Sequence, residues 1–365
     1  MSHIVPTALE AVSAFFTTEP QSVEPYGNGH INTTFLVITD NKRYILQKVN
    51  SNVFKKPHEV MKNILGVTAH IRKKAESEGK DPSRSTLTVV NTQSGKPYFD
   101  SSDGMCWRLY EFVEDTVSLD QVNSAEDFYN CAYAFGIFQQ QLADYPANEL
   151  FETIPNFHNT PWRYENLEKA IEADKAGRAS TVLPEIEFAK ARKDFCATLE
   201  NARLSGELPL RVTHNDTKLN NILFDAESGE AVCVIDLDTV MPGFSVNDFG
   251  DSIRFGANTA VEDETDLSKV SLDLELFRTY AEGFIKGCDG KLTAKELELL
   301  PVGAMMMTLE CGMRFLTDHL DGDVYFKIHR ENHNLDRCRC QFALVADMER
   351  KLDEMNAIIK ELSKK

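Results

Sequence analysis

The stretch RVTHNDTKLNNILFDAESGEAVCVIDLD, residues 211–238, decides the fold and carries most of the expected chemistry. It holds the pattern H-x-D-x-K-x-x-N from residue 214, then a hairpin pattern that ends in Ile-Asp at residues 235–236. A loop followed by a hairpin brings Asp216, Asn221 and Asp236 to one end of the stretch. A carboxylate can orient an acceptor hydroxyl and take its proton, and an amide with a second carboxylate suits magnesium. The stretch therefore predicts phosphoryl transfer.

Upstream of this stretch, the chain is typical of a small antiparallel sheet. Residues 33–39 and 43–49 are β-branched and apolar runs joined by the turn residues Asp40–Asn41. A helix over 61–71 and strands near 87–90 and 107–113 follow. Residues 27–33, GNGHINT, form a glycine-containing turn before the first strand. A plain hairpin turn is the alternative interpretation, because Asn32 replaces the third glycine of G-x-G-x-x-G.

Beyond residue 115 the apolar spacing becomes helical. Helices are expected over 124–142, with Ser124 as N-cap, and then over 162–175, 185–203, 271–286, 294–320 and 335–362. The apolar segment 299–316 carries Glu310 and Arg314, and so predicts a buried helix rather than a membrane span. The fold class is therefore α+β in two lobes. Residues 1–112 form the N-terminal lobe, and residues 113–365 form the larger, mainly helical lobe.

Composition limits the classes of partner. The 365 residues include 39 basic and 57 acidic side chains, a net charge of −18. That balance disfavours nucleic acid and anionic membranes, which attract clustered Lys and Arg. The eight cysteines form no C-x-x-C pair, and the first residues lack a secretory signal pattern. We expect reduced cysteines, a cytoplasmic location and a monomer.

Longer blocks carry a resemblance to a known family. HNDTKLNN and VIDLD look like the catalytic and metal motifs of the aminoglycoside phosphotransferase/choline kinase superfamily, relatives of the protein kinases. PYGNGHINTTFLV, RYILQKVN, DFGDSIRFGANTA and ECGMRFLTDHLDGDVYF are similar to the bacterial N-acetylhexosamine 1-kinases within it. These blocks run from about residue 25 to residue 326. The resemblance implies a protein-kinase-like fold, with ATP as co-substrate and Mg²⁺ as cofactor.

The resemblance also implies roles for individual residues. Asp216 would be the catalytic base, Lys218 would neutralise charge on the transferred group, and Asn221 and Asp236 would bind magnesium. Arg314 and Tyr325 would contact the sugar, although a structural ion pair and a packing aromatic are their alternatives. The nucleotide would be bound by the glycine loop, a strand lysine and the segment between the lobes: Gly27, Asn28, Gly29, Asn32, Thr33, Lys48, Glu111, Phe112 and Val113. Whether Lys48 or Gln47 faces ATP stays open, because successive strand residues point to opposite faces.

Asp248-Phe249-Gly250 spells the protein-kinase metal motif but fits a different role. Asp236 lies closer to Asn221 in sequence and ends a strand, so it suits a metal ligand better. We interpret DFGDSIRFG as the start of a helix in which Asp248 and Asp251 cap or support the active-site loop. His214 is expected to support that loop, and the role of Asp238 stays open.

The implied activity is phosphorylation of the anomeric C1 hydroxyl of N-acetylglucosamine or N-acetylgalactosamine, in amino-sugar salvage. One alternative is a kinase of another small acceptor, such as an aminoglycoside, choline, homoserine or a different hexose. The other is a nucleotide-binding pseudokinase that acts through partners. The intact Asp216, Asn221 and Asp236 argue against the pseudokinase.

Overall fold

The computed structural model describes residues 6–27, 31–119 and 124–364 of the chain. The chain forms two compact units, each assembled from separate stretches. The first comprises Met1–Ser118, Asp144–Pro155 and Asn221–Pro242, and the second comprises Leu119–Ala143, Asn156–Asn220 and Gly243–Lys365. The lobes expected from the sequence divide the chain once, at residues 112 and 113, and that division stays a prediction.

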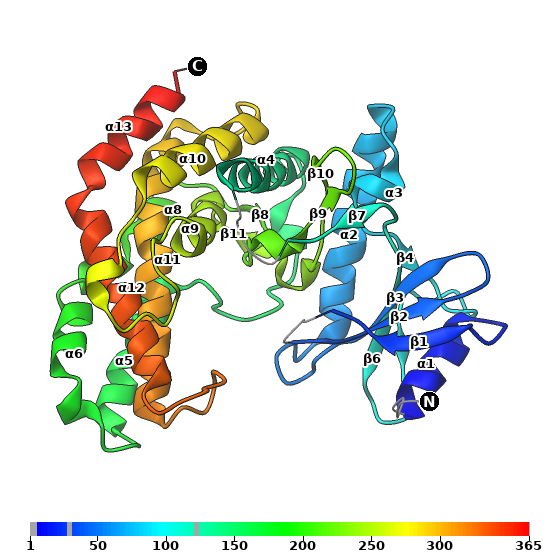
Figure 1. The fold of residues 1–365 in the computed structure, drawn as a ribbon, viewed down its shortest axis with the longest axis horizontal. Coiled ribbons are helices and arrows are strands. Elements are labelled where there is room, and N and C mark those ends of the chain that lie inside the picture. Colours follow the sequence, from blue (N-terminus) through cyan, green and yellow to red (C-terminus); the bar gives the residue numbers. More distant parts are fainter. Residues whose placement is uncertain (1–5, 28–30, 120–123, 365) are drawn as a thin grey trace. The chain divides into compact units, whose positions relative to one another are not determined.

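An antiparallel sheet lies at the centre of the first unit (Figure 1). Within the described residues its strands follow the order β1-β2-β3-β6-β4, and β5 also pairs with β6. The predicted hairpin is confirmed, because β2 pairs with β3 from Thr33 opposite Lys48 to Ile38 opposite Arg43. The strands are β1 Ser22–Pro25, β2 Thr33–Ile38, β3 Arg43–Lys48, β4 Val89–Val90, β5 Phe99–Asp100 and β6 Cys106–Glu111.

Helix α1, Pro6–Phe15, covers one face of this sheet and was not predicted from the sequence. Its apolar residues recur at three- and four-residue spacing, which places them on one helix face. They form a buried cluster with side chains of β2, β3 and β6: Ala8, Ala11, Val12, Phe15, Phe35, Val37, Leu46, Trp107 and Leu109.

Helix α2, Pro57–Ser77, contains the predicted helical segment and joins the separate stretches of the first unit. The Asn63 side chain donates to the carbonyls of Phe151 at 2.8 Å and Val240 at 2.9 Å. It also accepts the N–H of Phe151 at 2.9 Å. One buried amide thus connects three parts of the sequence. Two short helices complete this unit: α3, Pro82–Ser85, and η1, Ala147–Glu149.

A second small sheet in the first unit contains the stretch from which the sequence analysis began. Its strand order is β10-β9-β7, with β7 Thr116–Val117, β9 Ile222–Asp225 and β10 Ala231–Val234. Asp225 closes the β9–β10 turn by accepting the N–H groups of Glu227 and Ser228. Three short elements flank the hairpin: η3 Leu219–Asn221, η4 Leu237–Thr239 and β11 Met241–Gly243.

The second unit is mainly helical, as predicted. Ser124 is the N-cap of α4, because its side chain accepts the N–H of Asp127 at 3.0 Å. The larger elements are α4 Ala125–Gln141, α5 Thr160–Ala173, α9 Ser245–Gly256, α10 Leu274–Cys288, α11 Ala294–Asp321, α12 His333–Arg350 and α13 Leu352–Leu362. The smaller ones are η2 Ala179–Thr181, α6 Leu183–Lys190, α7 Lys193–Cys196, α8 Thr198–Leu204, β8 Arg211–Thr213 and η5 Leu267–Lys269.

The predicted helix over 185–203 is instead divided into α6, α7 and α8. The first break falls next to Arg192, whose guanidinium lies 3.4 Å from the centre of the Phe188 ring. The same side chain forms an ion pair with Glu349 of α12 at 2.6 Å. The long-range ion pair with Glu349 overrides the local helical preference.

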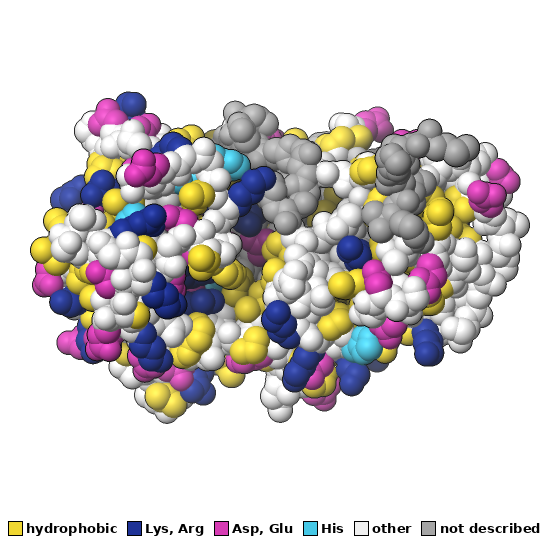
Figure 2. All heavy atoms as spheres, turned by 90° about the horizontal axis from the view of Figure 1, so that it is seen from below, with side chains coloured by type: hydrophobic (Ala, Val, Ile, Leu, Met, Phe, Trp, Pro, Cys, Tyr) yellow, Lys and Arg dark blue, Asp and Glu magenta, His cyan; other side chains and the backbone are white. Residues whose placement is uncertain are grey.

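Helix α11 is the core helix of the second unit. Of the described helices, it alone is long and apolar enough to cross a membrane, and 83% of its most apolar window is buried within the protein. This agrees with the expectation of a buried helix over 299–316. On the face shown in Figure 2, Lys and Arg side chains are interspersed with Asp and Glu.

Helices α9 and α11 approach each other closely at a pair of glycines. A Cβ atom on Gly250 of α9 would collide with the backbone of Gly303 in α11. A Cβ atom on Gly303 would collide with the backbone of Val246. Only glycine fits at these two positions, so the distance between α9 and α11 is fixed by backbone contact.

Glu296, in the first turn of α11, holds this helix to β8 and α9. Its buried carboxylate forms an ion pair with Arg211 and accepts the Ser245 hydroxyl at 2.6 Å and the Thr293 N–H at 2.8 Å. Thr293 in turn caps the helix through the N–H of Glu296. Burial opposes ionisation, but the hydrogen bonds, led by that from Arg211, hold the pKa of Glu296 below 4.5.

We predict that Glu296→Gln lowers the free energy of unfolding at pH 7 by about 3 kcal/mol, because Arg211 loses its buried partner. A lowered folded-state pKa stabilises the fold above the ordinary glutamate value of 4.5, and this contribution is lost as pH falls through the lower value. Urea unfolding at pH 7 and pH 4 should show a gap between variant and parent that narrows in acid. Glu298→Gln, which alters an exposed carboxylate two residues away, should change stability by less than about 0.5 kcal/mol. An equal loss in both variants would contradict the prediction.

Candidate active site

The loop that carries Asp216 follows β8 in the second unit, and the side chain of Asp248 in α9 supports it. The Asp248 carboxylate accepts the N–H of His214 at 2.9 Å and the N–H of Asn215 at 2.7 Å. It also accepts the Gln139 side-chain amide at 2.8 Å. Burial raises the pKa of Asp248, and the hydrogen bonds from His214, Asn215 and Gln139 oppose that rise. Asp248 thus supports the loop, as the sequence predicted.

The loop has an uncommon backbone conformation at the residue before Asp216. Asn215 has a φ angle of 63°, in the left-handed region that asparagine tolerates better than most residues. His214 is fully buried, with its ring edge-on to Phe135 at 5.4 Å and Phe138 at 5.8 Å between centroids. His214 therefore supports the loop from its apolar side and is not exposed to a substrate.

Asp216 and Lys218 form an ion pair at the surface of this loop. The Lys218 ammonium lies 2.7 Å from a carboxylate oxygen of Asp216, with side chains 43% and 23% exposed. Burial lowers the pKa of Lys218, but the carboxylates of Asp216 and Asp251 outweigh it and leave this pKa raised. The loop therefore presents a carboxylate and a fixed positive charge next to each other.

A buried polar link joins this loop to α11. His158 lies between the two, with Nδ1 2.8 Å from the Glu310 carboxylate and Nε2 3.2 Å from the Asn215 carbonyl oxygen. The second Glu310 oxygen accepts the Thr160 hydroxyl at 2.7 Å. Burial opposes ionisation of Glu310, yet the positive charge of His158 and two nearby arginines hold its pKa below the ordinary value.

Two arginines lie beside this link. The Arg314 guanidinium is 5.5 Å from the ring centres of both Phe157 and Phe326, and it makes no hydrogen bond or ion pair with any described residue. Arg163 of α5 donates to the Phe157 carbonyl at 2.8 and 3.2 Å. Burial, followed by the charge of Arg314, lowers the pKa of Arg163 to about 10. Both arginines stay charged near neutral pH.

Tyr325 lies on the turn after α11 and is 66% exposed. The Asp318 carboxylate orders this turn by accepting the N–H groups of Val324, Tyr325 and Phe326 at 2.8–2.9 Å. The Tyr325 ring lies edge-on to the Phe326 ring, with 4.8 Å between their centroids. The same Phe326 ring lies 5.5 Å from the Arg314 guanidinium, and contact of Tyr325 and Arg314 with a sugar stays a prediction.

In the first unit, the two predicted metal ligands lie at the open end of the β9–β10 hairpin. The Ile235 N–H donates to the Asn221 carbonyl at 2.9 Å, which brings Asp236 next to Asn221. Asp236 is exposed and has a φ angle of 56°, and Asn221 is 7% exposed. An amide and a carboxylate oxygen are hard donors, so the residues present fit magnesium.

Asp238, two residues after Asp236, has a structural role that the sequence left open. It forms a fully buried ion pair with Arg108 of β6, and it accepts the Asn32 amide at 2.6 Å. Burial lowers the pKa of Arg108, but the Asp238 carboxylate outweighs it and leaves the pKa raised. Gln47 of β3 accepts two hydrogen bonds from the same guanidinium, at 2.8 and 3.0 Å.

This network explains why Asn32 occupies the third glycine position of the loop. Its side chain bridges the strand backbone and Asp238, since it also accepts the N–H of Asn50 at 3.0 Å. Gln47 points toward Arg108, the partner of Asp238, so Lys48 points to the opposite face of β3. The contact of Lys48 with ATP stays a prediction, and Arg108 is the cation that the first unit places beside the Asp236–Asp238 segment.

The remaining predicted nucleotide residues are placed as follows. Gly27 has a φ angle of 74°, and Thr33 begins β2. Asn28 and Gly29 lie outside the described residues. At the end of β6, the N–H of Glu111 donates to the Thr88 carbonyl. In the segment that follows, the N–H of Phe112 donates to the Arg43 carbonyl, and the Val113 carbonyl accepts the Thr116 hydroxyl. The contact of Glu111, Phe112 and Val113 with adenine stays a prediction.

Sequence reasoning missed several residues of the site. The sequence gave no role to His158, Arg163, Glu310 or Arg108. His158 and Glu310 act through each other, and Arg108 acts through Asp238, which are partners far apart in sequence. Glu310 and Arg108 carried one usable signal, because each is a charge within an apolar run and therefore needs a buried partner. His158 and Arg163 gave no comparable signal.

Comparison with known proteins agrees with this geometry. The model of the Phosphotransferase enzyme family matches residues 22–281. The chain is also similar in fold to a microcompartment-associated aminopropanol kinase, with a TM-score of 0.63, 16% identity and coverage of 97% of this chain and 99% of the other. An aminoglycoside phosphotransferase from Alicyclobacillus acidocaldarius gives a TM-score of 0.64 at 14% identity, covering 100% and 98%.

A choline kinase from Cryptosporidium parvum has a TM-score of 0.52 at 15% identity, covering 94% of this chain and 92% of that one. The predicted protein-kinase-like fold, an antiparallel sheet followed by a mainly helical part, is confirmed. Because the family model covers more than half of the chain, the chain belongs to the Phosphotransferase enzyme family and is a small-molecule kinase.

Proposed function

We propose that the chain transfers the γ-phosphate of ATP to the anomeric C1 hydroxyl of N-acetylhexosamines. The proposal rests on the long sequence blocks similar to N-acetylhexosamine 1-kinases and on one structural observation. That observation is the pair of charged arginines, Arg314 and Arg163, beside the loop that carries Asp216. Guanidinium groups donate hydrogen bonds and accept none, so they suit the hydroxyl and amide oxygens of a neutral sugar.

The same charges disfavour a cationic acceptor. Choline and aminopropanol, the acceptors named for two similar structures, carry a positively charged nitrogen that needs free carboxylates or open aromatic faces. Here the aromatic rings beside the arginines are already engaged, since Phe157 and Phe326 contact the Arg314 guanidinium and Trp162 contacts that of Arg163. The nearby carboxylates are also engaged by protein donors: Glu310 by His158 and Thr160, Asp318 by the 324–326 turn, Asp323 by Arg178, and Asp251 by Arg254.

In the proposed reaction, the Asp216 carboxylate accepts a hydrogen bond from the C1 hydroxyl and takes its proton as the oxygen attacks phosphorus. Lys218, held 2.7 Å from Asp216, offsets charge that develops on the transferred group. Asn221 and Asp236 would hold magnesium, which neutralises the phosphate oxygens of ATP when bound. The C1–O bond is not broken, so the anomeric configuration of the bound sugar is kept.

A panel of acceptors tests the proposal. With Mg²⁺ and ATP, we expect ADP release with N-acetylglucosamine or N-acetylgalactosamine, together with loss of the reducing end. Glucose, kanamycin, choline, aminopropanol and homoserine should be turned over at least about tenfold less efficiently, since one misplaced polar contact costs this much or more. Product at C6 would refute the regiochemistry. If an amine is turned over preferentially, the acceptor is that amine and the sugar assignment is wrong. If no acceptor is turned over, the chain is better described as a nucleotide-binding protein without kinase activity.

We predict opposite effects for two aspartates that are separated by one residue. Asp236→Asn should reduce kcat at saturating Mg²⁺ by more than about 100-fold without loss of stability, because Asn tolerates the same backbone conformation. Asp238→Asn should instead lower the free energy of unfolding by about 3 kcal/mol, because Arg108 is left charged and buried. Steady-state kinetics and urea unfolding of both variants give the two readouts. Near-normal turnover in Asp236→Asn would remove it from the metal site.

We also predict that Arg314→Gln raises the KM for the acceptor by about 10- to 100-fold, because a charge-assisted hydrogen bond is worth about 1.5–3 kcal/mol. The KM for ATP should stay within about twofold of the parent. Arg330→Gln, an exposed arginine on the following loop that pairs with Asp263 and Asp336, is the matched control and should leave both constants unchanged. An acceptor KM that is unchanged in Arg314→Gln would assign this arginine to packing alone.

A further inference from the structure

The buried contact between α11 and the active-site loop contains one imidazole ring, that of His158. Its side chain is 9% exposed, and its two nitrogens lie 2.8 Å from Glu310 and 3.2 Å from the carbonyl of Asn215. Asn215 directly precedes Asp216 and is held in the left-handed region. The ring therefore contacts the peptide group between Asn215 and Asp216, whose orientation determines where the Asp216 carboxylate lies.

The hydrogen-bond partners define how many protons the ring carries. A neutral imidazole has one nitrogen that donates and one that accepts. The carbonyl oxygen of Asn215 only accepts, and an ionised Glu310 carboxylate also only accepts. Glu310 already accepts the Thr160 hydroxyl, and three positive groups, His158 first and then Arg163 and Arg314, hold its pKa low against the effect of burial. Both ring nitrogens must therefore donate, which requires an imidazolium.

Charged groups on three neighbouring elements act on this ring. Glu310 of α11 contacts it directly, and Asp251 of α9 lies close enough for the ring to lower the pKa of that carboxyl, against the effect of burial. Arg314 of α11 and Arg163 of α5 interact with the same Glu310 carboxylate and oppose a further positive charge. The positive charges of Lys218 on the loop and Arg254 of α9 are offset by the negative charge of Asp251.

We propose that His158 is a positioning residue for phosphoryl transfer, held as an imidazolium that clamps the Asn215 carbonyl and thereby fixes Asp216. The proposal rests on the proposed kinase activity and adds a residue to it. Glu310 supplies the counter-charge, so the clamp is present at and below neutral pH. When the ring loses a proton at higher pH, either the carboxylate or the carbonyl faces an unprotonated nitrogen, and the loop loses one of its supports.

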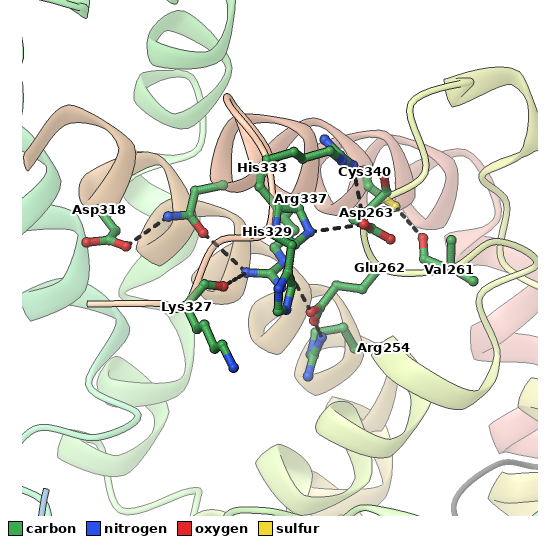
Figure 3. Close-up of polar contacts among 12 residues, drawn as sticks. Arg254, Val261, Glu262, Asp263, Asp318, Lys327, His329, His333, Arg337 and Cys340 are labelled. Atoms are coloured by element: carbon green, nitrogen blue, oxygen red, sulfur yellow. Dashed lines mark hydrogen bonds and ion pairs between the residues drawn. The ribbon is translucent and has the colours of Figure 1, made fainter. Parts of the chain in front are cut away.

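A second buried histidine of the same unit provides an internal reference. In His333, Nδ1 accepts the N–H of His329 at 3.2 Å, while Nε2 lies 3.0 Å from Asp263 (Figure 3). The nitrogen that accepts cannot carry a proton, so His333 is a neutral ring protonated on Nε2. The side chains of His158 and His333 are 9% and 4% exposed, and both face a carboxylate. Their second partners differ, since one is a carbonyl oxygen that accepts and the other an N–H group that donates.

Nitrogen NMR of the full chain, labelled with ¹⁵N in its histidine rings, tests the protonation state without any substrate. At pH 7 we expect both nitrogens of His158 at positions typical of an imidazolium, and one protonated and one unprotonated nitrogen for His333. Spectra of His158→Gln and His333→Gln provide the assignments. A neutral His158 ring at pH 6 would overturn the proposal.

The dependence of kcat on pH tests the positioning role. His158→Gln should lower kcat on the order of 10- to 100-fold with little change in the KM for ATP, since a small displacement of a reacting group costs this much. Glu310→Gln removes the anion that favours the imidazolium, so activity should be lost at a lower pH than in the parent. His58→Gln, an exposed histidine of the first unit, should leave the profile unchanged.

A purely structural role predicts a different outcome. In that case Glu310→Gln would lower activity by the same factor at every pH, and the alkaline limb would stay in place, which would overturn the proposal. If His158→Gln alone does not fold, the double variant His158→Gln/Glu310→Gln pairs two amides and removes the unpaired charge. It should then lose the pH dependence of the alkaline limb. The profile is measured with whichever acceptor the panel identifies, and the NMR needs none, so failure of the sugar assignment is distinguishable from failure of this inference.

Discussion

The buried carboxylate of Asp248 is the constraint on which the chemistry of the second unit depends. Two consecutive backbone N–H groups, those of His214 and Asn215, point at it, and this is compatible only with a sharp turn of the chain. The turn places Asn215 in the left-handed region and projects Asp216 away from the apolar rings that enclose His214. A buried carboxylate without hydrogen-bond donors would be costly in free energy. The same hydrogen bonds from His214 and Asn215 therefore stabilise the loop and supply the donors that the Asp248 carboxylate needs.

The first unit also buries a carboxylate, but there its partners are side chains rather than backbone N–H groups. Its buried ion pair between Arg108 and Asp238 holds the segment that carries Asp236 to the central sheet, and Asn32 joins the end of the glycine loop to the same carboxylate. Gln47, which is paired with Arg108 in the strand register, completes the network. The first unit thus buries its cation in a hydrogen-bonded network, whereas Arg314 in the second unit makes no hydrogen bond or ion pair with any described residue.

Local patterns predicted most of the fold. The β2–β3 hairpin, helices α2, α4 and α11 and the β9–β10 hairpin follow from alternation, helical spacing and turn residues, which act over a few positions. The same reasoning gave the candidate residues Asp216, Asn221 and Asp236, and the supporting role of Asp248. Helix α1 carried the required spacing and could have been found. Its apolar face is short, and it gains stability from the sheet rather than from its own sequence.

The rest depended on pairings that no local pattern encodes. Arg108 and Asp238 are 130 positions apart, and His158 and Glu310 are 152 positions apart, so neither partner identifies the other in the sequence. The orientation of Gln47 and Lys48 stayed open for the same reason. A strand fixes only that they point in opposite directions, and the register with β6 decides which of them meets Arg108.

The glycine contact between α9 and α11 has a consequence for how acceptor preference can diverge within this family. Since neither Gly250 nor Gly303 can gain a side chain, the two helices cannot drift apart or slide by small steps, as helices packed through flexible side chains can. Substitutions that preserve the fold therefore cannot change the spacing between α9, which supports the loop, and α11, which carries Arg314. In the proposed acceptor site, a change of specificity would therefore have to come from side chains on the turn after α11 and on α5, which makes these positions the natural targets for redesign.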